Sequence, residues 1–470
     1  MKILAWVMAG AAALAANSAS AAEMTPDLAA FRALYKELVE INTTQSVGDC
    51  TVAANAMAAH LKAAGYPDTD IHIVVPPGHP RRGNLVAVLH GTDAGAKAIL
   101  LLAHIDVVEA RRQDWDRDPF KMVEENGYFY ARGVADDKAM AAIFTDMMVR
   151  YKREGYRPRA AIKLALTCGE ETPEDYDGAR YLVEHDKPLI DAEFAINENG
   201  SGILDKAGKY VAITMQAGQK VQQHFKLEVT APGGISSGPP KATAITEMLR
   251  AVQRVSDFDF PLHISASTKA YLAGMAKLEK GEEADDMRAL LKNPPDEAAA
   301  ARMVKENPRT NSMLRTTCAA VELNAGEAES ALPRRADAIL DCHMAPGESV
   351  KQTQDTLAKV INDPKVSIEA VGDPGLPSPP PPVSEKILGP AREVAAKLWP
   401  GVPLIPYQVN GADDGRFLTP AGIPTYGLSG LFRDAGGDGS HGLNEHIRVR
   451  SVYEGREFLY AVVKKYAEGK

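Results

Sequence analysis

The sequence predicts an α/β fold, a sheet wrapped by helices, into which a second domain of α+β type is inserted. Two observations support this prediction. Between residues 71 and 200, short apolar runs alternate with segments of helical periodicity, which is typical of β–α–β units. From about residue 216 the character of the sequence changes, and residues 221–229 alternate between polar and apolar as in a strand that exposes one face to solvent.

The composition is that of an ordinary soluble globular protein, with 45% apolar and 24% charged residues among 470. The formal net charge is −9, and no run of lysines and arginines interrupts this acidic balance. A broad basic surface is therefore excluded, and nucleic acid is not an expected partner.

The first residues have the pattern of a secretory signal. Lys2 supplies a positive start, residues 3–16 are apolar but too few to span a bilayer, and residues 19–21 read Ala-Ser-Ala, a small-residue cleavage site. We therefore predict a signal peptide over residues 1–21 and an exported protein, periplasmic or secreted. The alternative is a buried N-terminal helix. No later stretch is apolar for long enough to form a membrane helix.

The elements expected before residue 216 follow one another as helices and buried strands. Apolar residues at helical spacing mark four helices: 27–39, 53–64, 140–150 and 178–185. Apolar runs mark five strands: 71–75, 84–90, 98–106, 160–171 and 192–200. Strand 98–106 is apolar on both faces until His104, which favours a position inside a parallel sheet.

The second domain is expected to combine antiparallel strands with helices. The expected strands are 221–229, 315–325 and 337–344; the expected helices are 242–255 and 349–361, with a charged, helix-prone stretch at 264–310. A proline-rich stretch at 372–385 is suited to an extended return crossing, and a helix resumes after it. The predicted boundaries are 22–215 and 374–470 for the first domain and 216–373 for the insertion.

Four cysteines, Cys50, Cys168, Cys318 and Cys342, are widely spaced and form no CxxC pair, so a cysteine zinc site is not expected. Export permits disulfides. The sequence leaves two alternatives open, a Cys318–Cys342 bridge or four buried free thiols.

Chemically active side chains recur where predicted strands end. His104 and Asp106 lie two residues apart, so that on a strand both point to the same side. Glu170 and Glu171 directly follow an apolar strand, and Glu198 follows another. Adjacent carboxylates at the mouth of a sheet repel each other, which makes sense if one binds a cation and the other transfers protons.

Two further segments complete the pattern. Asp136 and Asp137 lie between a glycine-containing turn and a helix, where they could also serve only the helix N-terminus. His441 lies in a glycine-rich loop, a place where a lone histidine is usually a surface residue. Histidines and carboxylates at successive strand exits, without cysteine ligands, suit zinc or a similar divalent ion, or two such ions bridged by a carboxylate.

Five ordered motifs, LLAHIDVV, GVADDKA, TCGEE, INENG and HGLNEHI, resemble those of the M20 family of metallopeptidases, which includes carboxypeptidases, dipeptidases, aminoacylases and desuccinylases. The resemblance covers nearly the whole mature chain. It implies a zinc-peptidase-type mixed sheet flanked by helices, with the inserted α+β domain as a lid. It also implies two divalent metal ions, with Zn²⁺ expected and Co²⁺ or Mn²⁺ as alternatives.

The resemblance also implies roles for individual residues. His104 and Glu198 would bind one metal, and Glu171 and His441 the other. Asp136 would bridge both.

The two remaining roles belong to Asp106, which would orient His104, and to Glu170, which would be the general base. The implied reaction is hydrolysis of an amide bond in small peptides or N-acyl amino acids, of the exopeptidase or aminoacylase type.

The chain departs from the family in the lid. A histidine that commonly helps to hold the oxyanion is Ile235 here, the motif Asn-x-x-Pro reads Ser-Ala-Leu-Pro at 330–333, and an arginine that often grips the substrate carboxylate is His343. A threonine near the C-terminal site is also changed, at 412–416. The candidate replacements for a carboxylate contact are Arg315, Arg334, Arg335, Arg416 and His343.

Two explanations compete for these changes. The first is an active hydrolase whose lid recognises a different substrate; the second is a metal-retaining peptide-binding protein with little or no turnover. We favour the hydrolase, because a spare buried carboxylate such as Glu170 has little use in a mere binder. A homodimer through the lid is also implied by the resemblance, although the histidine that usually reaches across is missing.

Overall fold

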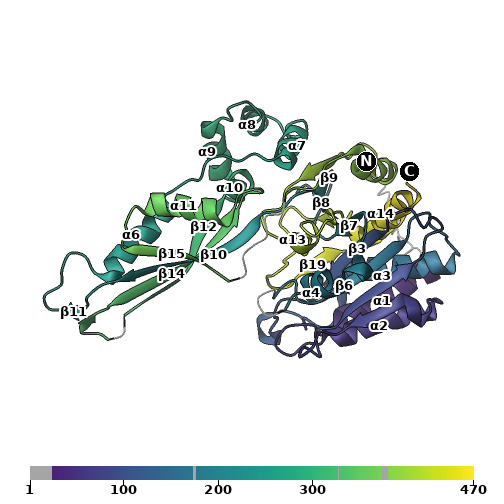
Figure 1. Cartoon of the computed structure of the whole chain (residues 1–470). Helices are drawn as coiled ribbons and strands as arrows, with labels where there is room; N and C mark the ends of the chain where they lie inside the picture. The colour runs from purple at the N-terminus through teal and green to yellow at the C-terminus, as the bar shows by residue number, and fades with distance from the viewer. Residues whose placement is uncertain (1–23, 173–175, 327, 373–378, 470) are drawn as a thin grey trace, which may run out of the picture.

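The computed structural model describes residues 24–172, 176–326, 328–372 and 379–469, so the predicted signal peptide lies outside the described residues. Most of the chain before residue 217 and after residue 378 forms one body around a mixed ten-stranded sheet (Figure 1). Its strands are β1 (Ile71–Val74), β2 (Asn84–Leu89), β3 (Ile99–His104), β6 (Ile162–Thr167), β7 (Phe194–Asn197), β8 (Gly202–Leu204), β9 (Tyr210–Gln216), β16 (Leu404–Tyr407), β17 (Thr425–Gly427) and β18 (Phe432–Arg433).

The centre of this sheet is parallel. Strand β3 lies between β6 and β7 and runs parallel to both, while β2 pairs antiparallel with β6. Every residue of β3 is buried, as its continuous apolar sequence predicts. The predicted α/β class with a mixed sheet is confirmed.

Helices cover both faces of the sheet. One apolar cluster joins it to α1 (Pro26–Glu40), α2 (Cys50–Ala63), α3 (Lys138–Arg153), α12 (Glu385–Leu398) and α14 (Val449–Glu468). A second cluster, on other strand residues, joins it to α4 (Gly178–His185), α5 (Lys187–Ile190) and α13 (Gly415–Leu418). A small sheet of β4 (Val123–Glu125), β5 (Tyr128–Tyr130) and β19 (His446–Arg448) lies beside them. Among the described helices, none combines the length and the hydrophobicity needed to cross a bilayer.

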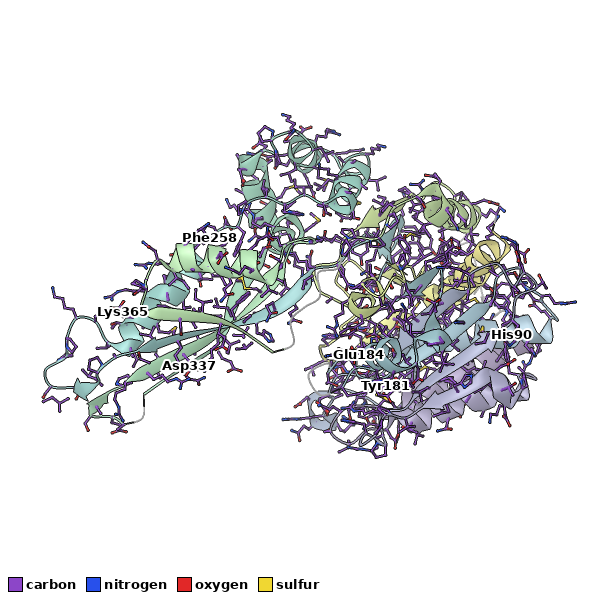
Figure 2. The ribbon with its side chains drawn as sticks, in the orientation of Figure 1. His90, Tyr181, Glu184, Phe258, Asp337 and Lys365 are labelled. Atoms are coloured by element: carbon purple, nitrogen blue, oxygen red, sulfur yellow. A yellow bond between two sulfur atoms is a disulfide. The ribbon has the colours of Figure 1, made fainter. Side chains whose placement is uncertain are left out.

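The second sheet is wholly antiparallel, in the order β12-β14-β10-β15. Its strands are β10 (Val221–Thr230), β12 (Thr317–Ala325), β14 (Arg335–Met344) and β15 (Val366–Val371), and α6 (Ala244–Ser256) and α11 (Val350–Ile361) pack on it. Figure 2 shows Phe258, Asp337 and Lys365 in this part of the molecule, well away from Tyr181 and Glu184 in the main body.

A small two-stranded sheet holds Ile235, the position at which the resemblance leads us to expect a histidine. Ile235 lies in β11 (Gly234–Ile235), which pairs with β13 (Ala331–Leu332) at the end farthest from the main body (Figure 1). Its side chain is 72% exposed.

The charged stretch at 264–310 forms four short helices together with the residues that follow it. They are α7 (Ala266–Met275), α8 (Glu282–Leu290), α9 (Glu297–Glu306) and α10 (Arg309–Leu314). Their apolar side chains form a core with Ile405 of β16 and Ala212 of β9. Gly274 allows the close approach, because a Cβ there would lie 2.8 Å from the Ile405 side chain. One face of this stretch therefore packs on the main sheet.

The chain crosses between the two bodies at residues 217–220, and this crossing is bonded to the loop that follows β16. Val409 donates its amide to the Gly218 carbonyl at 3.0 Å, and the Lys220 amide donates to the Gly411 carbonyl at 3.1 Å. The Gln219 side chain accepts from the Asp413 amide at 2.8 Å.

All four cysteines are paired, Cys50 with Cys168 and Cys318 with Cys342. The alternative of four free thiols is therefore wrong. The first bridge was not predicted, because its two cysteines are 118 residues apart and only the fold brings α2 to the end of β6. The second bridge links directly opposed residues of β12 and β14.

Candidate metal centre and active site

The candidate site lies at the carboxyl edge of the parallel strands. Strand β3 ends at His104, β7 ends one residue before Glu198, and β6 ends three residues before Glu170. Because β3 is parallel to both neighbours, these ends meet at one edge of the sheet. The structure thus brings together residues that are far apart in the sequence.

His104 lies at the centre of this group and is buried, with 2% of its surface exposed. Its Nε2 atom lies 3.3 Å from Asp136 and 3.9 Å from Glu198. Burial alone would lower the pKa of His104, but contacts with Asp106 and Asp136 raise it well above its usual value. Asp106 thus contacts the Nδ1 side of the imidazole, and the Nε2 atom faces the carboxylates of Asp136 and Glu198.

His441 approaches the same acids from the opposite end of the chain. Its Nε2 atom lies 3.0 Å from Glu171 and 3.2 Å from Asp136. These two contacts raise the pKa of His441 to about 10. Asp136 therefore lies between the two histidines, each facing a different carboxylate oxygen. This is the arrangement required of a bridging ligand.

Asp106 organises the group from behind. Its buried carboxylate accepts hydrogen bonds from the backbone amides of Glu170 at 3.3 Å and of Glu171 at 3.2 Å. The His104 Nδ1 atom lies 3.1 Å from the Asp106 carbonyl oxygen. Asp106 thus fixes both the histidine and the acidic turn, whereas the sequence predicts only the first of these roles.

Glu170 is half-buried and has an unusual electrostatic environment. Burial, together with the charges of Glu198 and Glu171, raises its pKa well above the usual range. A carboxyl group with a raised pKa at the mouth of a sheet is suited to accepting and returning a proton.

The donor set fits a divalent cation. Ligand atoms of His104, Asp136 and Glu171 lie within 4.8 Å of one another, and so do those of His104, Glu170 and Glu198. The buried Nε2 atom of His104 has no hydrogen-bond partner among the described residues, which is costly unless an ion or solvent completes the site. Imidazole and carboxylate ligands suit zinc and its neighbours.

Glu445 was missed by the sequence analysis, although it lies inside the quoted motif HGLNEHI. Its fully buried carboxylate accepts hydrogen bonds from the amides of Gly133, Ala135 and Asp136 at 2.7–3.1 Å, and it pairs with Arg132 at 2.7 Å. Glu445 therefore holds the turn that presents Asp136.

The proposed substrate-binding residues lie in different places. Arg416 is near the site: it donates to Asp177 at 3.1 Å, and its charge acts on Glu170. Arg315 is buried among the short helices, where it donates to the Phe260 carbonyl and pairs with Glu297. His343 lies on β14 and pairs with Asp341 at 3.3 Å. As described, neither Arg315 nor His343 contacts a member of the cluster.

Two further side chains border the cluster, and no sequence motif indicated them. Burial alone would raise the pKa of Asp136, but His104, His441 and the charge of Arg433, at the end of β18, lower it. Tyr407, at the end of β16, accepts a hydrogen bond from the Gly200 amide at 3.3 Å. Both strands belong to the main sheet.

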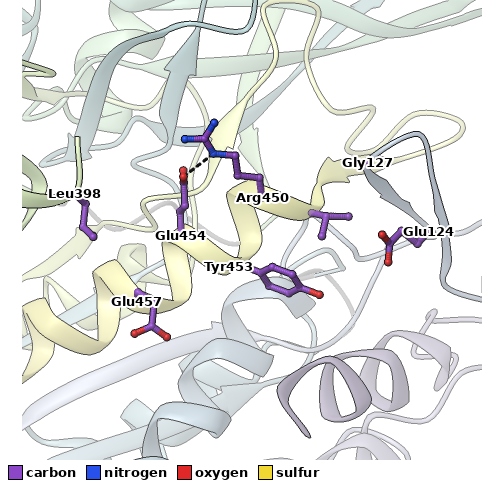
Figure 3. Close-up of a pocket in the computed structure, with 8 residues that line it drawn as sticks. Glu124, Gly127, Leu398, Arg450, Tyr453, Glu454 and Glu457 are labelled. Carbon is purple, nitrogen blue, oxygen red and sulfur yellow. Dashed lines mark hydrogen bonds and ion pairs between the residues drawn. The ribbon is translucent and has the colours of Figure 1, made fainter. Parts of the chain in front are cut away.

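A shallow groove elsewhere on the main body takes no part in this site. Figure 3 shows it over α14 and the β4–β5 turn, where Arg450 pairs with Glu454. None of the residues that line it is a histidine or belongs to the cluster.

The fold and the cluster together define an α/β protein with a candidate site for divalent metal at the edge of its main sheet. Residues 100–465 match the sequence model of Peptidase family M20/M25/M40, and the chain belongs to that family. The resemblance stated from the five motifs is confirmed.

Named proteins are similar over most of the chain. Human N-fatty-acyl-amino acid synthase/hydrolase PM20D1 is 25% identical over 384 residues, covering 80% of this chain and 75% of the human protein. Among solved structures, the M20 family metallo-carboxypeptidase Sso-CP2 from Sulfolobus solfataricus gives a TM-score of 0.68 at 18% identity, over 94% of this chain and all of that one (100%). A dinuclear metal binding peptidase of the M20 family, the YXEP protein of Bacillus subtilis, gives 0.59 at 11% identity over 93% and 100% of the two chains. The structural matches support the fold.

Proposed function

We propose that the protein is an exported, two-metal amidohydrolase that acts on peptides or N-acyl amino acids. The observation that carries the proposal is the position of Asp136 between His104 and His441, each of which also faces a glutamate. The names of the relatives, an acyl-amino acid hydrolase and a metallo-carboxypeptidase, agree with this substrate class.

His104 and Glu198 would hold one ion, Glu171 and His441 the other, and Asp136 both. When bound, such ions make a bound water more acidic and polarise the scissile carbonyl. Zn²⁺ is the expected metal.

Glu170 would be the proton carrier. It accepts a proton from the attacking water and returns it to the leaving amine, so that each bond cleavage regenerates the carboxylate. Asp106 keeps the carboxylate in place by binding the Glu170 backbone amide.

We also propose the division into a catalytic domain, residues 22–215 and 374–470, and a lid, residues 216–373. The separate antiparallel sheet and its own apolar core support this division. A lid whose usual histidine is Ile235 implies a substrate preference different from that of the typical family member.

The decisive experiment compares Glu170→Gln with the wild-type protein and with a control, Glu184→Gln, which changes an exposed acid on α4. Metal content is measured alongside release of free amine from a panel of dipeptides and N-acyl amino acids, with Zn²⁺, Co²⁺ or Mn²⁺ added. We expect Glu170→Gln to keep its metal and lose turnover, and the control to keep both.

Three outcomes would contradict the proposal. A wild-type protein without near-stoichiometric metal, or hydrolysis that survives Glu170→Gln, overturns the mechanism. Metal and peptide binding without turnover by the wild-type protein across the whole panel favours the alternative, a binding protein. Export is tested separately, by sequencing the N-terminus of the mature protein for cleavage after residue 21.

A further inference from the structure

We propose that Arg433, assisted by Tyr407, binds the free carboxylate of the substrate. This inference rests on the proposed function and names the group that recognises one end of the substrate. The lid position usually associated with such a contact is His343 in this chain, and it contacts no member of the cluster among the described residues. Another cationic side chain near the acidic cluster would therefore have to bind the substrate carboxylate.

Arg433 is beside the cluster because of the sheet topology. It ends β18, which pairs in parallel with β8, the strand that follows Glu198 after a short loop. Its positive charge acts on Asp136, the candidate bridging ligand, and on Glu198. A substrate held by Arg433 would therefore lie next to the metal centre.

The guanidinium of Arg433 has unused donors. Its Nε atom lies 3.0 Å from Asp438, and the side chain is 36% exposed. Neither terminal nitrogen has a hydrogen-bond partner among the residues that the structure describes. Two parallel N–H groups of an arginine match the two oxygens of a carboxylate, a geometry that adds specificity as well as binding energy.

Tyr407 offers a further donor close to Glu198. Its hydroxyl oxygen accepts from the Gly200 amide, two residues after Glu198, so its own O–H remains available. Burial raises the pKa of Tyr407 to about 12, and the charge of Arg433 opposes this rise.

The other candidate arginines are less accessible. Arg416 gives one terminal nitrogen to the buried Asp177, and its Nε atom is buried without a hydrogen-bond partner among the described residues. Arg315 has its own partners in the Phe260 carbonyl and Glu297. The Arg433 side chain is 36% exposed, against 21% for Arg416 and 6% for Arg315, so Arg433 is the most accessible of the three.

The test compares an N-acyl amino acid with its carboxamide, which lacks the negative charge but keeps the scissile bond. The proteins are the wild type, Arg433→Gln, Tyr407→Phe and a control, Arg448→Gln, whose arginine lies on β19 and pairs with Asp434. Metal content is measured for each, because loss of metal would mimic loss of recognition.

We expect the wild-type enzyme to prefer the acid. In Arg433→Gln, KM for the acid should rise about 10- to 100-fold, with metal content and hydrolysis of the carboxamide unchanged, because a charge-assisted contact is lost. Tyr407→Phe should show a smaller rise, and Arg448→Gln none.

Each contrary result has a distinct meaning. If Arg433→Gln keeps the preference for the acid, the inference is wrong and the proposed function stands. If kcat falls equally for both substrates, Arg433 serves the transition state, and carboxylate recognition is overturned. If the wild-type protein hydrolyses neither substrate nor any member of the wider panel, the proposed function fails and this inference fails with it.

Discussion

The carboxylate of Asp106 accepts a hydrogen bond from the backbone amide of Glu171 at 3.2 Å, and this bond joins the end of β3 to the turn that follows β6. The same carboxylate binds the amide of Glu170. One buried acid therefore sets the spacing between the candidate base and the candidate ligands.

Replacing Asp106 with asparagine tests this arrangement. An amide group can accept only one of the two backbone bonds well, because its nitrogen meets the second N–H as donor against donor. We expect Asp106→Asn to lower metal affinity or activity about 10- to 100-fold. Metal titration and kcat are the measurements, with Asp114→Asn on an exposed turn as the control. Equal metal affinity and equal kcat in Asp106→Asn and Asp114→Asn would show that Asp106 does not support the site.

Glu445 provides a second test of the support around the ligands. In Glu445→Gln, one carboxylate oxygen becomes an NH₂ group that faces backbone N–H donors in a fully buried space. Leaving such groups unpaired costs about 1–3 kcal/mol, and the turn carrying Asp136 should shift. We expect a lower melting temperature together with weaker metal binding, whereas Glu457→Gln, exposed on α14, should change neither. Unchanged metal binding would show that the turn holds its shape without Glu445.

The two disulfides should differ in what their removal does to catalysis. Cys168 directly precedes the turn with Glu170, whereas Cys318–Cys342 joins two strands of the second sheet. Replacing either pair by serine should cost about 2–5 kcal/mol of stability. At a temperature where both variants remain folded, we expect kcat to fall only when Cys50–Cys168 is removed. Equal kcat in the two variants would reduce the first bridge to a stabilising role.

Lys220 should make stability depend on pH. It is buried at the crossing between the bodies, where its ammonium donates to the carbonyls of Arg315 at 2.5 Å and His343 at 2.9 Å. Burial lowers its pKa to about 7, from an ordinary value of 10.5. Between pH 7 and pH 10.5, Lys220 is protonated in the unfolded chain but not in the folded chain. The free energy of unfolding therefore rises with pH, by up to about 1.4 kcal/mol per pH unit.

Lys220→Met should lack this contribution. We therefore expect the melting temperature of the wild-type protein to rise relative to that of Lys220→Met as the pH increases from 7 to 9. The control is Lys241→Met, which changes an exposed lysine and should follow the wild type. Parallel curves for wild type and Lys220→Met would mean that the buried lysine does not titrate in this range.

The sequence predicted the parts of the site that follow strand ends, because an apolar run that stops at a histidine or glutamate marks the edge of a parallel sheet. His104, Glu170 and Glu198 were predicted in this way, and the structure brings them together. His441 was predicted only jointly with them, since its loop has no periodic pattern of its own.

Other features depend on contacts that a linear pattern does not carry. The Cys50–Cys168 pair joins residues 118 positions apart. Arg433 and Tyr407 end short strands with no motif, and their nearness to the acids arises from the order of strands in the sheet. The sequence made Arg315 a candidate for binding substrate because it does not show the partners of this residue. These partners, the Phe260 carbonyl and Glu297, are brought to Arg315 by the packing of the short helices.

The bonds between residues 217–220 and the loop after β16 join the crossing to the neighbourhood of the candidate site. In that loop, the Asp413 amide donates to the Gln219 side chain, and the Asp413 carboxylate accepts from Asn199, the neighbour of Glu198, at 3.1 Å. A rotation of the second sheet about the crossing must either break these bonds or drag the loop with it. The position of the second sheet is thus tied, through the crossing and Asp413, to Asn199, the residue beside Glu198.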